Sequence, residues 1–410
     1  GFSYEEGDYK YGDRMTEAQE RMAERFGTQD EFGDEDESAK MENIRAIAQG
    51  KPADDIASVD GSFVENTSKF DPTPTSLPGI QNPDLLAQRD AELMANHFKT
   101  EHFEQVMNAG DIRWSLPKLV YHLEDLRVGM SYPNYYISRL ASKFVKVCLQ
   151  GTGGDELFGG YPWRYYKVFD SLNREQFFDQ YYQFWQRLVP DTEKKELFTT
   201  DVFDKIDVDE PRKIFERVFT FNKKLKYDTP EEHINNSLYF EIKTFLPGLF
   251  LVGDKLAMAH GLEERFPFMD NDLVDFAMKV PVKHKLGNLE KEIERIDENV
   301  EKKKKVYREF DDGKNVLRKA MSDFIPEAIV NRKKQGFSAP DESWYRGENA
   351  EYVKELLLSK NTVSTKYIDK EYITKTVDEH INKGINHRLL IWSFMNFEWW
   401  CRIFLNGEKV

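Results

Sequence analysis

A glycine-rich loop with two adjacent carboxylates is the part of this 410-residue chain whose residue types are best suited to chemistry. The loop, residues 151–162, reads GTGGDELFGGYP and directly follows an apolar stretch. Gly151, Gly153 and Gly154 would let the backbone approach a ligand closely. A helix that starts near Asp155 would add free N–H groups and a partial positive charge. The loop therefore predicts a site for a phosphate group.

The two acids in this loop, Asp155 and Glu156, make that prediction more specific. Bare carboxylates would repel phosphate, but a Mg²⁺ ion held between a carboxylate and phosphate oxygens removes the conflict. The alternative is that both acids only cap the helix, which stabilises it by about 1 kcal/mol. Spacing alone leaves the two interpretations open.

The elements around the loop predict an α/β architecture. Residues 143–150 are β-branched and apolar at their centre, which is typical of a buried parallel strand. Helical periodicity at 85–98, 116–123 and 135–142 precedes that strand. This order of helix, strand, glycine loop and helix is typical of α/β proteins, which bind ligands at the carboxyl ends of their strands.

Two segments differ in composition from the rest of the chain. Residues 30–85 are acidic and polar, and we expect a disordered insertion there. Residues 281–313 carry an apolar stripe, so we expect a helix that packs on its own domain or forms a dimer contact. The stripe consists of Leu286, Leu289, Ile293, Ile296 and Val300. The other predicted parts are an N-terminal piece at 1–29, a core at 86–280 and a helical C-terminal part at 314–410.

Composition narrows the class of protein. The net charge of −15 and the pI near 5.2 leave no basic footprint for nucleic acid. No apolar run reaches membrane-spanning length, so we expect a cytoplasmic protein without a membrane partner. The two cysteines, Cys148 and Cys401, have neither metal-ligand spacing nor a disulfide framework. We interpret Cys148 as a buried core residue and both cysteines as inert thiols in a reducing compartment.

Several motifs resemble, in the same order, those of the C-terminal synthetase domain of asparagine synthetases of the glutamine-hydrolysing type. The most specific is GTGGDELFGGYPWRYY at 151–166. The others are FKTEHFEQVM at 98–107, which would be a helix end and a strand, LPKLVYHLEDLRVG at 116–129, DKLAMAHGLEERFPFMDNDLVDFA at 254–277, KNVLRKAM at 314–321 and NRKKQGFSAP at 331–340. The resemblance extends over residues 84–400. It implies a parallel-sheet domain of the ATP-pyrophosphatase type, incomplete at its N-terminus, with a largely helical C-terminal part.

The resemblance implies ATP-dependent formation of an amide. An acid would attack the α-phosphate of ATP, pyrophosphate would leave, and ammonia, free or derived from glutamine, would displace AMP. Aspartate is the default acceptor. ATP and Mg²⁺ would be the cofactors, with Asp155 as a metal ligand. The residues around the nucleotide would be Gly151, Gly153, Gly154, Asp155 and Glu156.

Two lysines match cationic positions of the family. Lys255, in DKLAMA, would lie near the phosphates, with a surface salt bridge as the alternative. Lys334, in RKKQGF, would stabilise the transition state of adenylation. We interpret Glu263, Arg265 and Asp270 as a structural framework of ion pairs.

The chain also departs from the family pattern. The family's Ser-Gly-Gly-x-Asp-Ser pyrophosphate loop has no match here. We expect that loop, and a glutaminase domain or subunit, upstream of residue 1, which would make this chain a fragment of the active enzyme. Thr152 is a candidate catalytic residue, but it occupies a position where many members of the family have Asp or Glu. Its hydroxyl group cannot act as a general base in the way a carboxylate can. A sugar acid or a peptide as acceptor, a non-catalytic scaffold role and a homodimer therefore stay open.

Overall fold

The computed structural model describes residues 83–126, 131–287, 312–332 and 341–410. The chain divides into two compact units, 1–78 and 79–410, and the described residues belong to the second. The predicted N-terminal piece at 1–29 and nearly all of the predicted insertion at 30–85 lie outside the described residues. Most of the predicted insertion at 281–313 does too, so these domain boundaries stay predictions.

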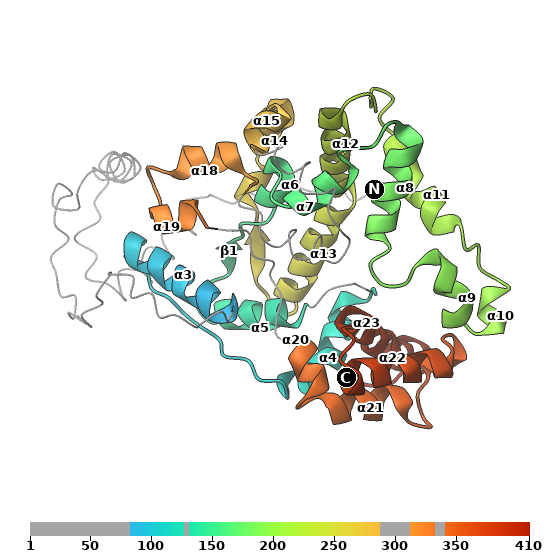
Figure 1. Ribbon diagram of the computed structural model, residues 1–410. Helices are drawn as coiled ribbons and strands as arrows, with labels where there is room; N and C mark the ends of the chain where they lie inside the picture. Colours follow the sequence, from blue (N-terminus) through green and yellow to red (C-terminus); the bar gives the residue numbers. More distant parts are fainter. Residues whose placement is uncertain (1–82, 127–130, 288–311, 333–340) are drawn as a thin grey trace, which may run out of the picture. The chain divides into compact units, whose positions relative to one another are not determined.

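The described part of the chain is largely helical, as Figure 1 shows. The first helices are α3 Pro83–Phe98, α4 Asp111–Leu123, α5 Tyr132–Ala141, α6 Gly154–Phe158, α7 Pro162–Tyr165, α8 Arg174–Trp185, α9 Lys194–Leu197, α10 Thr200–Phe203, α11 Glu210–Thr220, α12 Pro230–Lys243 and α13 Phe245–Met258. They are followed by α14 Asn271–Lys279, α15 Val282–Lys285, α18 Asn315–Met321, α19 Glu327–Val330, α20 Asp341–Arg346, α21 Ala350–Leu358, α22 Lys370–Asn382 and α23 Arg388–Trp400. Shorter turns are η3 Tyr166–Val168, η4 Asp191–Glu193, η5 Pro267–Met269, η6 Ser364–Lys366 and the π-helical η7 Cys401–Leu405. The three helices predicted before the glycine loop are confirmed as α3, α4 and α5.

The strands form a two-stranded parallel sheet, in which β1 Val147–Leu149 pairs with β2 Glu263–Arg265. The predicted α/β class is confirmed at this level, while a larger sheet is not found among the described residues. The strand predicted within FKTEHFEQVM is wrong, because α3 ends at Phe98 and residues 101–108 have no regular structure.

The prediction that β1 is buried is wrong for one of its faces. Val147 and Leu149 are 51% and 75% exposed, while Cys148 between them is half-buried rather than part of a core. Side chains alternate along a strand, and Cys148 lies in register with Glu264, whose side chain packs against Gly253 of α13. α13 therefore covers only the face that carries Cys148, and the opposite face stays open to solvent.

The two largest hydrophobic cores hold many of the helices together. The larger one joins α4, α5 and α13 to α21–α23 and contains the fully buried Trp392 and Tyr132. The second is aromatic and joins α8, α11 and α12 through Phe177, Phe215 and Phe240. Burial of each large apolar side chain contributes about 1.5–3 kcal/mol, so these cores fix the helices that lead to and from the sheet.

The predicted framework of ion pairs among Glu263, Arg265 and Asp270 is confirmed for the first two residues only. Glu263 and Arg265 form an ion pair at 3.1 Å. Asp270 does not join that pair. Its Oδ1 accepts from the backbone N–H groups of Asp272 and Leu273 at 3.0 and 3.1 Å, which caps α14.

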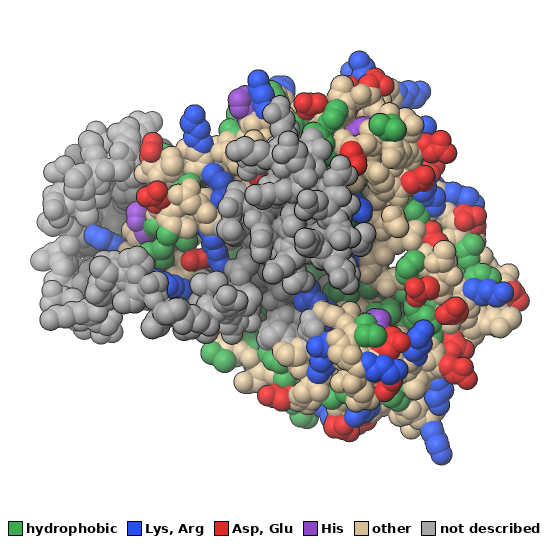
Figure 2. All heavy atoms as spheres, in the orientation of Figure 1, with side chains coloured by type: hydrophobic (Ala, Val, Ile, Leu, Met, Phe, Trp, Pro, Cys, Tyr) green, Lys and Arg blue, Asp and Glu red, His purple; other side chains and the backbone are tan. Residues whose placement is uncertain are grey.

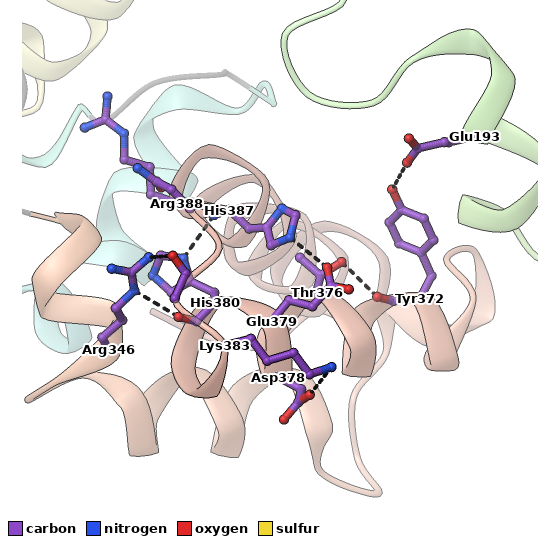
Figure 3. A network of polar contacts seen from close by, with 12 residues as sticks. Glu193, Arg346, Tyr372, Thr376, Asp378, Glu379, His380, Lys383, His387 and Arg388 are labelled. Carbon is purple, nitrogen blue, oxygen red and sulfur yellow. Dashed lines mark hydrogen bonds and ion pairs between the residues drawn. The ribbon is translucent and has the colours of Figure 1, made fainter. Parts of the chain in front are cut away.

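Polar contacts fix the C-terminal helices (Figure 3). Arg346 Nε on α20 donates to the backbone carbonyl of His380 on α22 at 2.9 Å. His380 Nδ1 accepts from the backbone N of His387 at 3.0 Å, so the neutral ring carries its proton on Nε2. Tyr372 donates from its hydroxyl to Glu193 Oε2 at 2.9 Å, which joins α22 to η4. These bonds set the positions of helices that come from distant parts of the sequence.

Charged side chains of both signs are interspersed on the face shown in Figure 2. Around α11 they form exposed ion pairs, such as Lys213 with Asp207 at 2.5 Å and Arg217 with Glu210 at 3.1 Å. Exposed pairs of this kind typically contribute less than about 1 kcal/mol each, so the fold depends on its cores rather than on its surface charges.

The two residues that flank the segment 288–311 are bonded to each other. Gly287 donates from its backbone N to Asp312 Oδ1 at 2.8 Å. Leu286, the first residue of the predicted apolar stripe, is 1% exposed and packs with Tyr165 and Ile234 in a core of the domain. Contacts among the described residues therefore hold together the two residues that flank the segment.

Replacing residues 288–311 by a short Gly-Ser linker should change the free energy of unfolding by less than about 1 kcal/mol, because Gly287 and Asp312 already meet and the entropic cost of joining them depends only weakly on the number of residues between them. As a contrast, Leu286→Ala should lower that free energy by about 2–4 kcal/mol through lost core packing. Urea unfolding of the three proteins measures both. A linker protein that is destabilised as much as Leu286→Ala would show that the removed segment is part of the core.

Candidate functional site

The glycine loop makes a sharp turn at the carboxyl end of β1. Gln150 donates from its backbone N to Arg265 O at 2.8 Å, which ends the pairing with β2. Gly153 then adopts a φ of 106°, in the left-handed region, and a Cβ there would overlap the side chain of Met269. Gly154 begins α6 and packs on the ring of Phe268. The predicted turn and the helix start beside Asp155 are confirmed.

Asp155 is held between a glycine and a lysine. Its carboxylate lies against the backbone of Gly160, where a Cβ would overlap Oδ1. Gly160 donates from its backbone N to Asp155 O at 2.7 Å, directly after Gly159 at φ 74°. On the other side Asp155 Oδ1 forms an ion pair with Lys314 Nζ at 3.0 Å, and the two side chains are 23% and 26% exposed. The carboxylate therefore has a fixed position and remains accessible from solvent.

Lys314 is a site residue that the sequence reasoning missed, although its motif, KNVLRKAM, was recognised. Its backbone N donates to Phe158 O at 3.0 Å, and its φ of 57° lies in the left-handed region. Gly313 precedes it at φ 100°, and a Cβ there would come within 2.6 Å of Gly159 O. The available signal was a Gly-Lys pair directly before a predicted helix, as a glycine permits two backbones to cross closely.

A buried aspartate supports this crossing. Asp312 is 2% exposed, and its Oδ1 accepts from the backbone N–H groups of Gly287 and Gly313 and from Asn315 Nδ2, at 2.8, 2.8 and 2.9 Å. Its Oδ2 accepts from the hydroxyl of Tyr166 at 2.5 Å. The four bonds tie the turn that carries Lys314 to α15 and η3, which keeps the ammonium group facing Asp155.

Glu156 points into the protein rather than toward the outer edge of the loop. It is 1% exposed, and its Oε1 accepts from the hydroxyl of Tyr161 at 2.9 Å. Burial raises the pKa of this carboxyl group, although the bond from Tyr161 opposes the rise. Its present contacts are structural, and its contact with a nucleotide stays a prediction.

Lys255 closes the end of α4 in this structure. Its Nζ donates to Leu123 O and to Glu124 Oε2, both at 2.8 Å, and Glu124 has the left-handed φ of 58° expected at a helix end. These contacts match the salt-bridge alternative, and none of them connects Lys255 to Asp155. The predicted place of Lys255 near phosphate therefore stays a prediction.

Of the remaining predicted site residues, the structure describes Gly151 and Thr152 but not Lys334. Gly151 is exposed with open space around it, and the half-buried Thr152 beside it makes no side-chain hydrogen bond to any described residue. Lys334 lies in residues 333–340, outside the described part of the chain. The structure thus brings Gly153, Gly154 and Asp155 together with Lys314, and it gives no position for Lys334.

A second carboxyl group holds the start of the loop. Gln150 Nε2 donates to Glu264 Oε1 at 2.7 Å, and Glu264 packs so closely on Gly253 of α13 that a Cβ there would come within 2.5 Å of Oε2. Burial raises the pKa of Glu264. Glu264 thereby couples both strands and α13 to the residue that precedes Gly151.

The residues at Asp155 fit a Mg²⁺ ion that shares its ligands with phosphate. Among the described residues no group of three or more His, Cys, Asp or Glu side chains could hold a metal ion by itself. Mg²⁺ is commonly bound by one or two carboxylates together with substrate phosphates. The accessible Asp155 carboxylate, already facing one cation at 3.0 Å, offers that kind of ligand.

Gly160→Ala tests the fixed position of Asp155. The added Cβ would overlap the carboxylate, so we expect ATP-dependent activity to fall at least about 10-fold through displacement of a catalytic group. The expected loss of stability is smaller, about 1 kcal/mol. Steady-state kinetics and thermal unfolding check both values. Unchanged kinetics in a folded Gly160→Ala protein would contradict the placement of Asp155 at the reacting groups.

Asp312→Ala tests the support of Lys314. Because four donors lose their acceptor, the free energy of unfolding should fall by about 2–4 kcal/mol. Asn315→Ala removes only one of these donors and should cost less than about 1.5 kcal/mol. Urea unfolding of both variants measures the difference, and equal losses would show that Asp312 is not the centre of the turn.

Comparison with known proteins identifies the family of this chain. The asparagine synthase family model matches residues 86–402. Asparagine synthetase (glutamine-hydrolyzing) 1 of Bacillus subtilis is 27% identical over 390 residues, which cover 86% of this chain and 55% of the relative. Asparagine synthetase (glutamine-hydrolyzing) 3 of the same organism is 24% identical over 298 residues, 70% of this chain and 42% of the relative. A protein named amidase chry2 from Gibberella zeae is 26% identical over 152 residues, 37% of this chain and 20% of that protein.

Each match covers a larger share of this chain than of the relative. The chain spans about half the length of the curated asparagine synthetases it matches. Within the described residues, no helix is both long and apolar enough to cross a bilayer. The family model covers most of the chain and includes the glycine loop, Asp155, Lys255 and Lys314. The chain therefore belongs to the asparagine synthase family.

Proposed function

We propose that this chain carries the synthetase part of an ATP-dependent, amide-forming ligase. An acid would be activated on the α-phosphate of ATP with release of pyrophosphate, and ammonia would then displace AMP. The observation that carries the proposal is the Asp155–Lys314 ion pair at 3.0 Å, located beside the glycine turn at the carboxyl end of β1. Parallel strands bind nucleotides at this end. The names of its curated relatives, asparagine synthetase (glutamine-hydrolyzing), support the same reaction.

Asp155 and Lys314 have complementary roles in this proposal. When bound, Mg²⁺ would neutralise charge on the phosphate oxygens. Asp155 would orient the ion, and the ammonium of Lys314, released from its carboxylate partner, would turn to the phosphates as a fixed cation. The loop glycines Gly151, Gly153 and Gly154 would keep side chains away from the nucleotide. Support comes from the accessibility of both charged groups, 23% and 26%.

Two further lysines complete the proposed set of cations. We place Lys334 at the transition state of adenylation on the strength of its motif. Lys255 would have to leave Leu123 O and Glu124 to reach a phosphate, so we propose that it acts through the end of α4 unless nucleotide binding moves it. Glu156 would support the loop from inside through Tyr161.

The proposal leaves open which acid serves as the acceptor substrate. Aspartate is the default acid, with ammonia that is free or that a glutaminase domain or subunit releases from glutamine. The hydroxyl of Thr152 makes no hydrogen bond to the described residues, and it can donate a hydrogen bond but cannot act as a base in the way a carboxylate can. This residue favours a second candidate, an amidotransferase or cyclase that acts on a sugar acid or a peptide. An intact Asp155–Lys314 pair favours catalysis over a scaffold role.

Site variants test the proposal in the natural full-length protein, supplied with ATP, Mg²⁺, glutamine or ammonia, and candidate acids. Asp155→Asn and Lys314→Met should each lower the rate of AMP release at least about 100-fold. Arg113→Gln, which removes the exposed ion pair with Glu355 and the contact of the guanidinium group with the Tyr352 ring, is the matched control and should stay within about 2-fold of wild type.

The outcome is decided by AMP and pyrophosphate, both quantified by chromatography. If wild type forms neither product with any acid, the ligase proposal fails. If wild type is active and both site variants match Arg113→Gln, the reaction occurs but not at this loop.

A further inference from the structure

Buried hydrogen-bond donors without acceptors gather between α7 and α8. The side chain of Arg164 is 6% exposed, yet its Nε and Nη1 have no hydrogen-bond partner among the described residues. The indole Nε1 of Trp185 has none either. The guanidinium carbon of Arg164 lies 5.2 Å from the centre of the Trp185 ring, so these donors share one place. Buried polar groups are rarely left unbonded, and three in one place require an explanation.

The neighbouring carboxylate of Glu241 does not supply the missing hydrogen-bond acceptor. Glu241 Oε1 lies 3.3 Å from Arg164 Nη1 without hydrogen-bond geometry. Its two oxygens already accept from the hydroxyls of Tyr165 and Tyr181, at 3.1 and 3.3 Å. Burial raises the pKa of Glu241 to about 7, against the opposing charge of Arg164, so this carboxyl group is only partly ionised near neutral pH. The positive charge of Arg164 is therefore incompletely balanced.

Aromatic rings fix the plane of the Arg164 guanidinium group. Its carbon lies 3.8 Å from the centre of the Tyr161 ring and 4.4 Å from that of Phe245. Such stacking stabilises the cation while leaving its N–H edges free to bond. The two nitrogens of Arg164 that lack an acceptor among the described residues, Nε and Nη1, thus keep fixed directions, and as charged donors they favour an anionic acceptor.

A second guanidinium group adds to the positive charge. Arg187 follows Trp185 closely in sequence, is exposed as a residue, and has no side-chain hydrogen bond or ion pair among the described residues. Its pKa is lowered by burial of the charged end, then by the charges of Arg164 and Arg388, with Glu241 opposing them. An anion beside Arg164 would therefore be attracted by the charges of both guanidinium groups and could accept from the indole N–H of Trp185.

This cluster is close to the glycine loop. The ring that stacks on Arg164 belongs to Tyr161, whose hydroxyl donates to Glu156 at 2.9 Å. Glu156 is the neighbour of Asp155 in α6. One side chain therefore separates the unbonded donors from the loop at which we propose that the acid is activated.

We propose that Arg164, Trp185 and Arg187 bind a carboxylate, and that the acceptor supplies it as a second acid group, separate from the group that is activated. The assignment to the acceptor rests on the proposed function, while the carboxylate site itself does not. A carboxylate offers two acceptor oxygens and one negative charge to the unbonded N–H groups of Arg164 and Trp185. A phosphate dianion would meet the neighbouring Glu241 with twice the repulsion.

Binding is tested on the full chain without ATP, with ¹⁵N-labelled tryptophan. Trp185→Phe identifies the indole resonance of Trp185. Succinate, its uncharged diamide and inorganic phosphate are then titrated separately. We expect succinate to shift the Trp185 resonance saturably, and the diamide to leave it unchanged. Arg187→Gln should weaken succinate binding at least about 10-fold, the loss expected for one charge-assisted bond, whereas Arg113→Gln should not.

The site is overturned if succinate does not shift Trp185, or if Arg187→Gln binds succinate as tightly as wild type. Phosphate binding at least as tight as succinate would also overturn it, since the site would then be one for inorganic anions.

Kinetics test the assignment to the acceptor. In the active natural protein, Arg187→Gln should raise KM for the acid at least about 10-fold and leave KM for ATP within about 2-fold. An unchanged KM for the acid would overturn the assignment. If no acid is turned over at all, the proposed function and the acceptor assignment fail together, while the titration still decides whether the carboxylate site exists.

Discussion

The candidate site depends on one ion pair, between Asp155 on α6 and Lys314 before α18. The two residues are far apart in sequence, and their contact requires backbones to cross where a side chain would not fit. Gly159 and Gly313 make the crossing possible, and Gly160 leaves room for the carboxylate. Asp312, bonded to four donors, fixes the turn on the lysine side. Backbone geometry therefore positions the charged groups of Asp155 and Lys314, and the flexibility of their side chains contributes little.

Much of the architecture near the site follows from local sequence signals. Helices before β1 were predicted because apolar residues recur at helical spacing, and the glycine turn because Gly153 and Gly154 flank a helix start. The structural role of Asp270 was predictable in kind, although it caps a helix instead of joining Glu263 and Arg265. Burial was harder to predict, since Val147 and Leu149 are apolar strand residues that nevertheless face solvent.

The long-range contacts of the site could not be predicted from the sequence. Nothing in the composition of KNVLRKAM says that Lys314 faces Asp155, because that contact follows from the crossing of two glycine-containing turns. Similarly, the inward direction of Glu156 onto Tyr161 could not be predicted from the loop, and its contact with a nucleotide stays a prediction. Likewise Lys255 was predicted from its motif, but its neighbours are set by the end of α4. Side-chain direction at a helix start depends on packing, which a single sequence does not determine.

The central claim is that the acid becomes joined to the α-phosphate of ATP at this site. It is tested most directly by following ¹⁸O from a labelled acceptor carboxylate during turnover of the natural protein. An acyl-adenylate requires that one carboxylate oxygen leaves with AMP when ammonia attacks, so mass spectrometry should find AMP carrying one ¹⁸O. Label in inorganic phosphate together with ADP, or no label in any nucleotide product, would contradict the account.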